Sequence, residues 1–251
     1  MWICGAACLP DGGDLGILVA MNTLTRGMVA EFMGTFLFVF FGCASIIMTQ
    51  KDLGANGSLV TIALAHGLTL GVMITACMYV SGGQLNPAVS IGLVVAGKQK
   101  PVQAVAFIVA QLLAASCAAG MLQLILSPDV ANHQSVKLGA TIGTLTNHVN
   151  TQGVFLVEAI ATFALMVSVL MSTVDARAHK LGGLVIGLTL AAAIMAIGPL
   201  TGASLNPART FGPAICGSHW DMHWVYWAGP VFGASAAAFV YKVVWDSKPS
   251  T

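Results

Sequence analysis

Apolar residues run along most of this chain without the regular alternation with polar residues that marks soluble helices and strands. Six of these runs are about 20 residues long, the length that an α-helix needs to cross the hydrocarbon core of a bilayer. The pattern therefore predicts an all-α membrane protein with six transmembrane helices. The predicted spans cover residues 27–48, 59–80, 102–126, 153–174, 181–200 and 224–245.

Two shorter apolar segments follow the second and the fifth predicted span, and each starts with the tripeptide Asn-Pro-Ala. Asparagine caps helix starts and proline is favoured at the first helical position, so we predict helices over 86–96 and 206–215. At this length each helix reaches only about halfway through the hydrocarbon core. Irregular backbone at such depth is tolerated only where it is buried or lines a wet cavity. The pattern indicates a pore or an enclosed central site at Asn86, Pro87, Ala88, Asn206, Pro207 and Ala208.

The two halves of the chain repeat each other. The segment EFMGTF at Glu31 corresponds to EAIATF at Glu158, and the segment GLTL occurs at Gly67 and again at Gly187. The Asn-Pro-Ala tripeptides are displaced by 120 residues, as are the GLTL segments. Because each copy holds three spans, the second copy enters the membrane from the opposite face and forms an inverted repeat. The two short helices should then meet near the membrane midplane.

Composition agrees with a membrane protein and excludes several functions. Of the 251 residues, 57% are hydrophobic and 8% are charged, whereas about a quarter are charged in a typical soluble domain. The net charge of +1 provides no basic surface for nucleic acid. No nucleophile–base set, cofactor loop or metal-ligand spacing is visible, so we expect no enzyme activity, no cofactor and no metal. Cys4 and Cys8 could pair or bind a metal, but the other cysteines lie in or beside apolar segments, where buried thiols are expected.

Basic residues predict the orientation of the chain in the membrane. In the six-span scheme most of them fall on one side, and only Lys51 and Lys137 fall on the other. The positive-inside rule therefore places both termini in the cytoplasm, but it does not distinguish a vacuolar or other intracellular membrane from the plasma membrane. The residues on the cytoplasmic side are Arg26, Lys98, Lys100, Arg177, Lys180, Lys242 and Lys248.

The paired Asn-Pro-Ala tripeptides, the glutamates in the first and fourth spans, and the patterns Ser-Gly-Gly-x-x-Asn-Pro-Ala and Asn-Pro-Ala-Arg resemble the major intrinsic protein family, the aquaporins. The resemblance covers residues from about 25 to 245. It implies the aquaporin fold, a right-handed bundle of six tilted helices plus two re-entrant half-helices, with one pore per subunit and assembly as a homotetramer. The expected parts are a mobile N-terminal leader (1–25), a first repeat (26–126), a connecting loop (127–152), a second repeat (153–245) and a C-terminal tail (246–251).

Arg209 is the only basic residue predicted inside a membrane segment, and such residues usually serve a function. Its alternative role is structural, with the guanidinium binding backbone carbonyls. The resemblance places Arg209 in the selectivity filter of the pore. Three further filter positions follow by their spacing from the two asparagines: His66, Ile194 and Ala203. With Thr210 after the arginine, this set is most similar to the tonoplast intrinsic proteins and to animal relatives that conduct ammonia and hydrogen peroxide.

Three other polar residues have two interpretations each. His133 resembles a loop histidine that extends the filter in some tonoplast members, although one residue is inserted relative to that pattern. The alternative is a solvated loop histidine. Glu31 and Glu158 are the only carboxylates in predicted spans, and a proton-coupling pair would indicate a transporter. The resemblance implies instead that both accept hydrogen bonds from the half-helix loops.

The predicted function is a passive channel for water and other small neutral solutes, such as ammonia and hydrogen peroxide, that excludes protons and ions. The expected partners are these solutes, membrane lipid and other copies of the chain. Amide donors of Asn86 and Asn206 would orient water at the pore centre, and Arg209 would repel cations, as in aquaporin-type pores generally. The alternatives are a glycerol- or urea-conducting aquaglyceroporin, a proton-coupled secondary transporter, and a structural membrane protein with little flux.

Overall fold

The computed structural model describes residues 22–49, 58–131, 133, 137–175, 177 and 181–246, and these ranges form helices and connections without β-strands. Six helices in this part of the chain are long and apolar enough to cross a membrane. The prediction of an all-α membrane protein with six spans is therefore confirmed. The six helices are α1 (Thr23–Met48), α2 (Leu59–Ser81), α4 (Pro101–Ile125), α7 (Thr151–Val169, continued by the π-helical turn η3, Leu170–Val174), α8 (Gly182–Thr201) and α10 (Val225–Val244).

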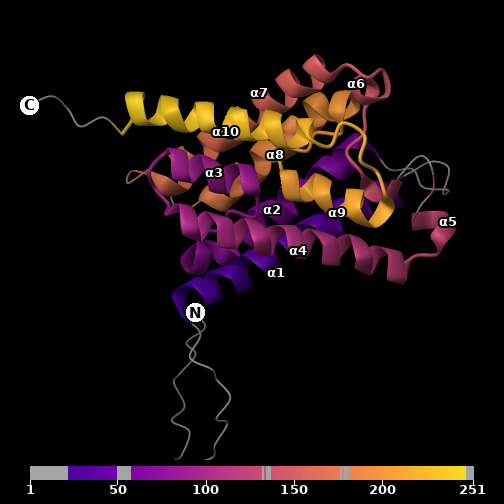
Figure 1. Ribbon diagram of the computed structural model, residues 1–251, viewed down its shortest axis with the longest axis horizontal. Helices are drawn as coiled ribbons and strands as arrows, with labels where there is room; N and C mark the ends of the chain where they lie inside the picture. Colours follow the sequence, from indigo (N-terminus) through magenta and orange to yellow (C-terminus); the bar gives the residue numbers. More distant parts are fainter. Residues whose placement is uncertain are drawn as a thin grey trace, which may run out of the picture.

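The two Asn-Pro-Ala segments form the predicted short helices, α3 (Pro87–Val95) and α9 (Pro207–Gly217). Figure 1 shows α3 and α9 toward opposite ends of the bundle, with α3 near the end where α10 finishes. Helix α3 packs against α10, and α9 packs against α4. The fold therefore inserts one half-helix from each side, so that their N-terminal ends face the interior.

Helix α1 begins and α10 ends on the same side of the bundle (Figure 1). Gly27 near the start of α1 lies beside Ser81 at the end of α2. Lys98, just after α3, binds Asp246, just after α10, at 2.9 Å. On the opposite side, the connection predicted as a loop contains the short helices α5 (Pro128–Ala131), η2 (Lys137–Gly139) and α6 (Thr144–Asn147).

Helices α2 and α8, one from each repeat, cross at glycines. A Cβ atom at Gly67 would lie 2.5 Å from the carbonyl oxygen of Gly187, and a Cβ at Gly187 would collide with the carbonyl of Gly67. One turn away, a Cβ at Gly71 would lie 2.8 Å from the carbonyl oxygen of Gly183. Small residues at this spacing let membrane helices approach closely, where packing rather than the hydrophobic effect holds them together. The repeated Gly-Leu-Thr-Leu segment therefore forms part of one contact between the repeats.

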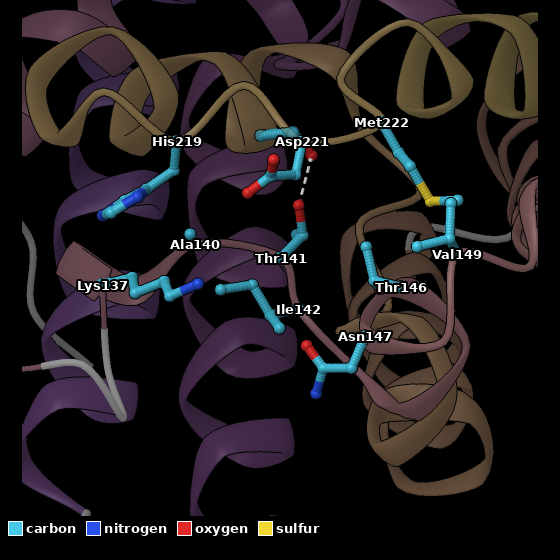
Figure 2. A pocket seen from close by; sticks show the side chains of 11 residues that line it. Lys137, Ala140, Thr141, Ile142, Thr146, Asn147, Val149, His219, Asp221 and Met222 are labelled. Carbon is cyan, nitrogen blue, oxygen red and sulfur yellow. Dashed lines mark hydrogen bonds between the residues drawn. The ribbon is translucent and has the colours of Figure 1, made fainter.

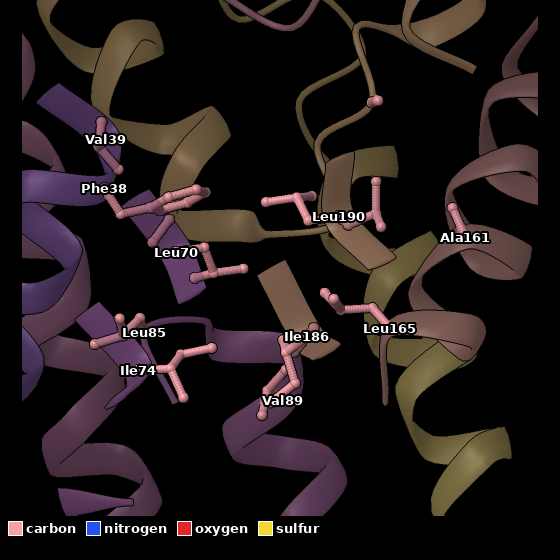
Figure 3. Packing of buried hydrophobic residues seen from close by; sticks show 14 of the residues in the cluster. Phe38, Val39, Leu70, Ile74, Leu85, Val89, Ala161, Leu165, Ile186 and Leu190 are labelled. Carbon is pink, nitrogen blue, oxygen red and sulfur yellow. The ribbon is translucent and has the colours of Figure 1, made fainter. Parts of the chain in front are cut away.

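The interior of the bundle is filled from both repeats. Figure 3 shows Phe38 of α1, Leu70 of α2, Val89 of α3, Leu165 of α7 and Leu190 of α8 among its buried side chains. The outer surface is apolar as well, which suits a surface in contact with lipid. The backbone groups are paired within the helices and need no partner from the lipid. Large apolar side chains that are exposed include Leu68, Val72, Leu188, Phe232 and Phe239.

Some predicted features lie outside the described residues. They are most of the leader (1–21) with Cys4 and Cys8, Lys51, residues 134–136 next to His133, Lys180, and the tail beyond Asp246 with Lys248.

Candidate functional site

Asn86 and Asn206 cap the two half-helices. The side-chain oxygen of Asn86 accepts a 2.9 Å hydrogen bond from the backbone N–H of Ala88. Asn206 accepts equivalent bonds from Ala208 (3.0 Å) and Arg209 (3.4 Å). Each asparagine has extended backbone angles and is followed by proline at the first helical position, as the tripeptide predicts. The positive ends of both helix dipoles therefore face the interior of the bundle.

The two caps also bind each other's loops. The amide nitrogen of Asn86 donates a 2.8 Å hydrogen bond to the carbonyl of Leu205, and that of Asn206 donates a 2.8 Å bond to the carbonyl of Leu85. Both leucines have a positive φ (51° and 53°), which turns their carbonyls toward the opposite repeat. An amide nitrogen carries two hydrogens, and only one of each pair has a partner among the described residues. One N–H donor therefore remains on each asparagine where the half-helices meet.

Glu31 lies beneath the first of these loops. Its buried carboxyl group accepts hydrogen bonds from the backbone N–H groups of Gln84 (2.9 Å) and Leu85 (2.7 Å) and from the hydroxyl of Ser81 (2.7 Å). The side-chain amide of Gln111 on α4 donates a fourth bond at 2.8 Å. The carboxyl group thus binds the backbone donors of the loop that leads into α3.

Glu158 occupies the corresponding place in the second repeat. It accepts hydrogen bonds from the hydroxyl of Thr201 (2.7 Å) and from the backbone N–H groups of Ser204 (3.0 Å) and Leu205 (2.8 Å). Both glutamates are completely buried. Each loop thus donates two backbone N–H groups to a buried glutamate.

Arg209 and His66 are in contact. Arg209 is 1% exposed; its Nη1 donates a 2.8 Å bond to the carbonyl of Gly139, and its Nη2 lies 3.4 Å from Nε2 of His66. The other ring nitrogen of His66, Nδ1, lies 2.9 Å from the carbonyl of Ile62. A guanidinium only donates and a carbonyl only accepts. The imidazole therefore carries its proton on Nδ1 and presents a lone pair to Arg209, which is the neutral form.

Ile194 and Ala203 are both buried. Ala203 has a positive φ of 45° in the loop before α9, and its N–H donates to the hydroxyl of Thr201 at 3.1 Å. Ile194 lines a cavity of about 470 Å³, together with Ile62, whose carbonyl faces His66. The structure thus brings Arg209 and His66 into direct contact, and it places Ile194 in a cavity wall with Ile62, the residue whose carbonyl lies beside His66.

A second cavity of about 390 Å³ shares Lys137 and Ile142 with the first, and Figure 2 shows the side chains that line it. Its wall includes Lys137, His219, Asp221 and the hydroxyls of Thr141 and Thr210, which lie 3.1 Å apart. Burial, followed by the positive charge of Lys137, lowers the pKa of His219, with a smaller opposing effect of Asp221. The histidine is therefore neutral at pH 7, so Lys137 carries the positive charge of this cavity.

His133 remains a prediction. It is partly buried, and its carbonyl accepts a 2.9 Å bond from the N–H of Lys137.

The sequence analysis did not predict a set of hydrogen-bonded polar side chains at α3 and the loop before it. The hydroxyl of Ser90 lies 2.6 Å from Oε1 of Gln84 and 3.2 Å from Nε2 of Gln111. In the second repeat, the hydroxyls of Ser204 and Thr210 lie 2.5 Å apart. Positions 84 and 90 are displaced from 204 and 210 by the same 120 residues as the asparagines. This displacement was the sequence signal for these hydrogen bonds, because it places polar residues at equivalent positions in the two repeats.

A third cavity, of about 250 Å³, lies on the side where α1 begins and α10 ends. It is lined by polar side chains that include Ser81, Gln84, Lys98, Gln99 and Gln103. It borders the loop before the first asparagine, whereas the other two cavities are lined by the connection that includes residues 137–147. Among the described residues, no group of three or more histidines, cysteines and acids could hold a metal ion.

An inverted pair of half-helices with capped tips in a six-span bundle defines a multi-pass membrane protein with a central polar site. The family model of the major intrinsic proteins matches residues 19–241, and the chain belongs to this family. Aquaporin TIP4-4 of Zea mays is 41% identical over 224 residues, which are 86% of this chain and 85% of that protein. Probable aquaporin TIP3-2 of Arabidopsis thaliana is 38% identical over 229 residues, which cover 86% and 82%.

Among solved structures, the X-ray structure of the aquaglyceroporin from Plasmodium falciparum is similar, with a TM-score of 0.78 and 26% identity. The match covers 88% of this chain and 96% of that chain. These comparisons confirm the resemblance to aquaporins. The protein is a channel of the aquaporin type and not an enzyme.

Proposed function

We propose that this channel conducts water and other small neutral solutes, including ammonia and hydrogen peroxide, and excludes protons and ions. The observation that carries the proposal is the reciprocal pair of hydrogen bonds between the half-helix tips. It fixes one remaining N–H donor on Asn86 and one on Asn206 at the point where the two repeats meet. A water molecule there would turn its oxygen toward both donors, and this orientation interrupts a proton wire, as in aquaporin-type pores.

Fixed positive charge supports the exclusion of cations. Two helix N-termini point their partial positive charges at the same region. Arg209 adds a full charge that no carboxylate among the described residues neutralises by an ion pair. Together these charges favour neutral solutes over protons and other cations.

The filter that we propose consists of His66, Ile194, Ala203 and Arg209. Arg209 donates hydrogen bonds, and neutral His66 provides a ring that both donates and accepts in a single orientation. Ile194 provides no hydrogen-bonding group. The filter therefore favours water less strongly over solutes that have fewer hydrogen-bonding groups. This balance of width and polarity is the reason to expect ammonia and hydrogen peroxide beside water. Glu31 and Glu158 support the pore indirectly, since their carboxyl groups hold the loops that carry both asparagines.

We further propose that both termini face the cytoplasm and that four copies assemble, each with its own pore. Among the described basic residues, Arg26, Lys98, Lys100, Arg177 and Lys242 lie at the side where α10 ends. This distribution agrees with the positive-inside rule. Apolar side chains exposed on α2 and α8 provide surface for contact with neighbouring copies as well as with lipid.

The test is stopped-flow permeability of vesicles that contain the purified protein, compared with empty vesicles. We expect fast, non-saturating water flux with a low activation energy, together with flux of ammonia and hydrogen peroxide. Flux that saturates and follows a proton gradient would instead indicate a secondary transporter.

Glycerol or urea conduction is the second candidate, because a similar solved structure is an aquaglyceroporin. Thr210 weakens this candidate: glycerol facilitators are expected to carry an aspartate after the filter arginine. Here the Thr210 hydroxyl bonds to Ser204 and Thr141 instead. Glycerol flux as fast as water flux would favour the second candidate.

A further inference from the structure

Helix α1 has a glycine, Gly42, at the place where the ring of His66 lies against it. A Cβ atom at Gly42 would lie 2.6 Å from Nε2 and 2.7 Å from Cδ2 of His66. Atoms in favourable van der Waals contact are normally about 3.5–4.0 Å apart. The edge of the imidazole therefore occupies the space that a side chain at position 42 would need.

Other contacts leave this ring little freedom to move. Phe38, one turn before Gly42 on the same face of α1, makes a T-shaped contact with the ring, with centroids 5.9 Å apart. Its buried side chain points into the interior of the bundle (Figure 3). On the imidazole itself, Nδ1 lies 2.9 Å from the carbonyl of Ile62, and Nε2 lies 3.4 Å from Nη2 of Arg209. The position of the ring is thus set by α1, by its own helix and by the arginine.

The next residue of α1 supports the other hydrogen-bond partner of Arg209. The carbonyl of Gly139 accepts the 2.8 Å bond from Nη1, and this glycine has a φ of 76°. A Cβ atom at Gly139 would lie 2.7 Å from Cβ of Cys43, so the loop lies directly on α1 at this point. Gly42 and Cys43 thus support both groups that contact the guanidinium.

The second repeat has a larger residue at the position equivalent to Gly42. The correspondence of EFMGTF with EAIATF places Val169 of α7 there, and the residue equivalent to His66 is Ile186, directly before the second Gly-Leu-Thr-Leu segment. Both residues are buried. Glycine is also less favourable than alanine inside a helix. Neither the helix nor the equivalent packing therefore requires a glycine at position 42, whereas the imidazole of His66 does.

We propose that Gly42 is a specificity-determining residue of the channel, outside the four positions of the proposed filter. Because position 42 has no side chain, His66 lies against α1 and leaves its side of the filter open. A larger residue at position 42 displaces the ring away from α1 by about 1 Å. The filter then becomes narrower, which excludes hydrogen peroxide more than water because hydrogen peroxide is the larger solute. The inference rests on the proposed channel function.

The test measures water and hydrogen peroxide permeability of vesicles that contain the full-length protein. Gly42→Ala should lower the ratio of hydrogen peroxide to water permeability about tenfold, the lower end of the effect of one methylene group on discrimination in a tight site. The matched control is Gly120→Ala on α4, where a Cβ meets nothing closer than 3.9 Å, and its ratio should equal that of wild type. A wild-type ratio in Gly42→Ala overturns the proposal.

A double-mutant cycle with His66→Ala separates this role from a general packing role of Gly42. Without the imidazole there is no ring to displace, so Gly42→Ala should leave the ratio of the His66→Ala protein unchanged. An effect that arises from α1 itself would occur in both backgrounds. Equal effects of Gly42→Ala on the ratio in the two backgrounds therefore overturn the proposal.

Thermal unfolding of the same four proteins in detergent covers the case in which Gly42→Ala folds poorly. If the added methyl group collides with the imidazole, Gly42→Ala should lower the unfolding midpoint of wild type more than that of His66→Ala. An equal loss in both backgrounds overturns the contact on which the proposal depends. This measurement needs no solute flux. Wild-type vesicles without water flux would refute the proposed channel function, and with it the role in specificity, while the unfolding data still report the contact between Gly42 and His66.

Discussion

The side-chain amide of Asn86 donates a 2.8 Å hydrogen bond to the backbone carbonyl of Leu205, on the other half-helix loop. Asn206 returns the same bond to Leu85, so the two repeats are joined at their tips by two equivalent contacts. Each asparagine thus uses its oxygen for its own helix and one N–H for the opposite loop. These bonds fix the orientation of each asparagine side chain and therefore of its remaining N–H donor. A selective pore requires donors that are fixed in this way.

Replacing Arg209 with valine should widen the constriction and remove its fixed charge. The carbonyl of Gly139 loses its donor and His66 loses its neighbour, so small-solute flux should rise and proton exclusion should weaken. Stopped-flow permeability and a pH-sensitive dye inside the vesicles measure the two effects. Lys242→Met, which removes an exposed positive charge from the last turn of α10, is the control. A folded Arg209→Val protein with the wild-type solute profile would show that Arg209 does not line the filter.

The close approach of α2 and α8 makes Gly187 sensitive to a single methyl group. Gly187→Ala places a Cβ against the backbone carbonyl of Gly67, which no side-chain rotation can relieve. We expect a loss of about 1–3 kcal/mol of stability, as for other overpacked sites.

Gly120→Ala is the matched control, because a Cβ at Gly120 on α4 meets nothing closer than the sulfur of Cys216 at 3.9 Å. It should be neutral or stabilising, since alanine favours helix more than glycine. Thermal unfolding in detergent measures both variants. Equal stability of Gly187→Ala and wild type would mean that the two helices do not cross this closely.

The spans were predictable because a bilayer imposes one length and one polarity on every helix that crosses it. The half-helices were predictable because the tripeptide encodes the cap and the first helical residue. Helix ends were less predictable. Helix α1 begins at Thr23, four residues before the predicted start, because Asn22 accepts a 2.9 Å bond from the N–H of Thr25. Helix α9 continues to Gly217 and ends where Ser218 adopts a φ of 56°.

Contacts between distant residues were the hardest to predict. Gln111 reaches Glu31 across 80 residues of sequence, and no periodicity in the chain encodes that pairing. The contact of Arg209 with His66, 143 residues apart, followed only from the spacing of a known family. Local patterns thus predict helices and caps, but the partners of buried polar groups depend on how the repeats pack.

Asp175 should contribute to stability in a pH-dependent way. It lies at the end of η3, where Arg177 binds it at 2.8 Å and Tyr241 of α10 donates to it at 3.4 Å. Hydrogen bonds from the guanidinium of Arg177 and from its backbone N–H hold the pKa of this carboxyl well below its usual range. In the unfolded chain the carboxyl has its ordinary pKa of about 3.9. Its contribution is therefore present above that value and lost as the pH falls below it.

The measurement is thermal unfolding of wild type and Asp175→Asn between pH 7 and pH 3. The destabilisation by the substitution should be largest at pH 7 and shrink toward pH 3. Asp129→Asn, at an exposed acid in α5, is the matched control. A difference between wild type and Asp175→Asn that is constant with pH would contradict the assignment.

Replacing His66 with phenylalanine should change the choice of solute more than the flux of water. Neutral His66 has its Nδ1 proton on the carbonyl of Ile62 and its Nε2 lone pair toward Arg209. Phenylalanine is slightly larger and offers neither group, so the ring narrows and loses a polar partner. The space is already tight, because a Cβ at Gly42 would lie 2.6 Å from Nε2 of His66. Ammonia and hydrogen peroxide permeability should therefore drop more steeply than water permeability. The readout is the ratio of ammonia to water permeability in the same vesicles, which does not depend on the amount of incorporated protein. An unchanged ratio in His66→Phe would show that His66 does not set the choice of solute.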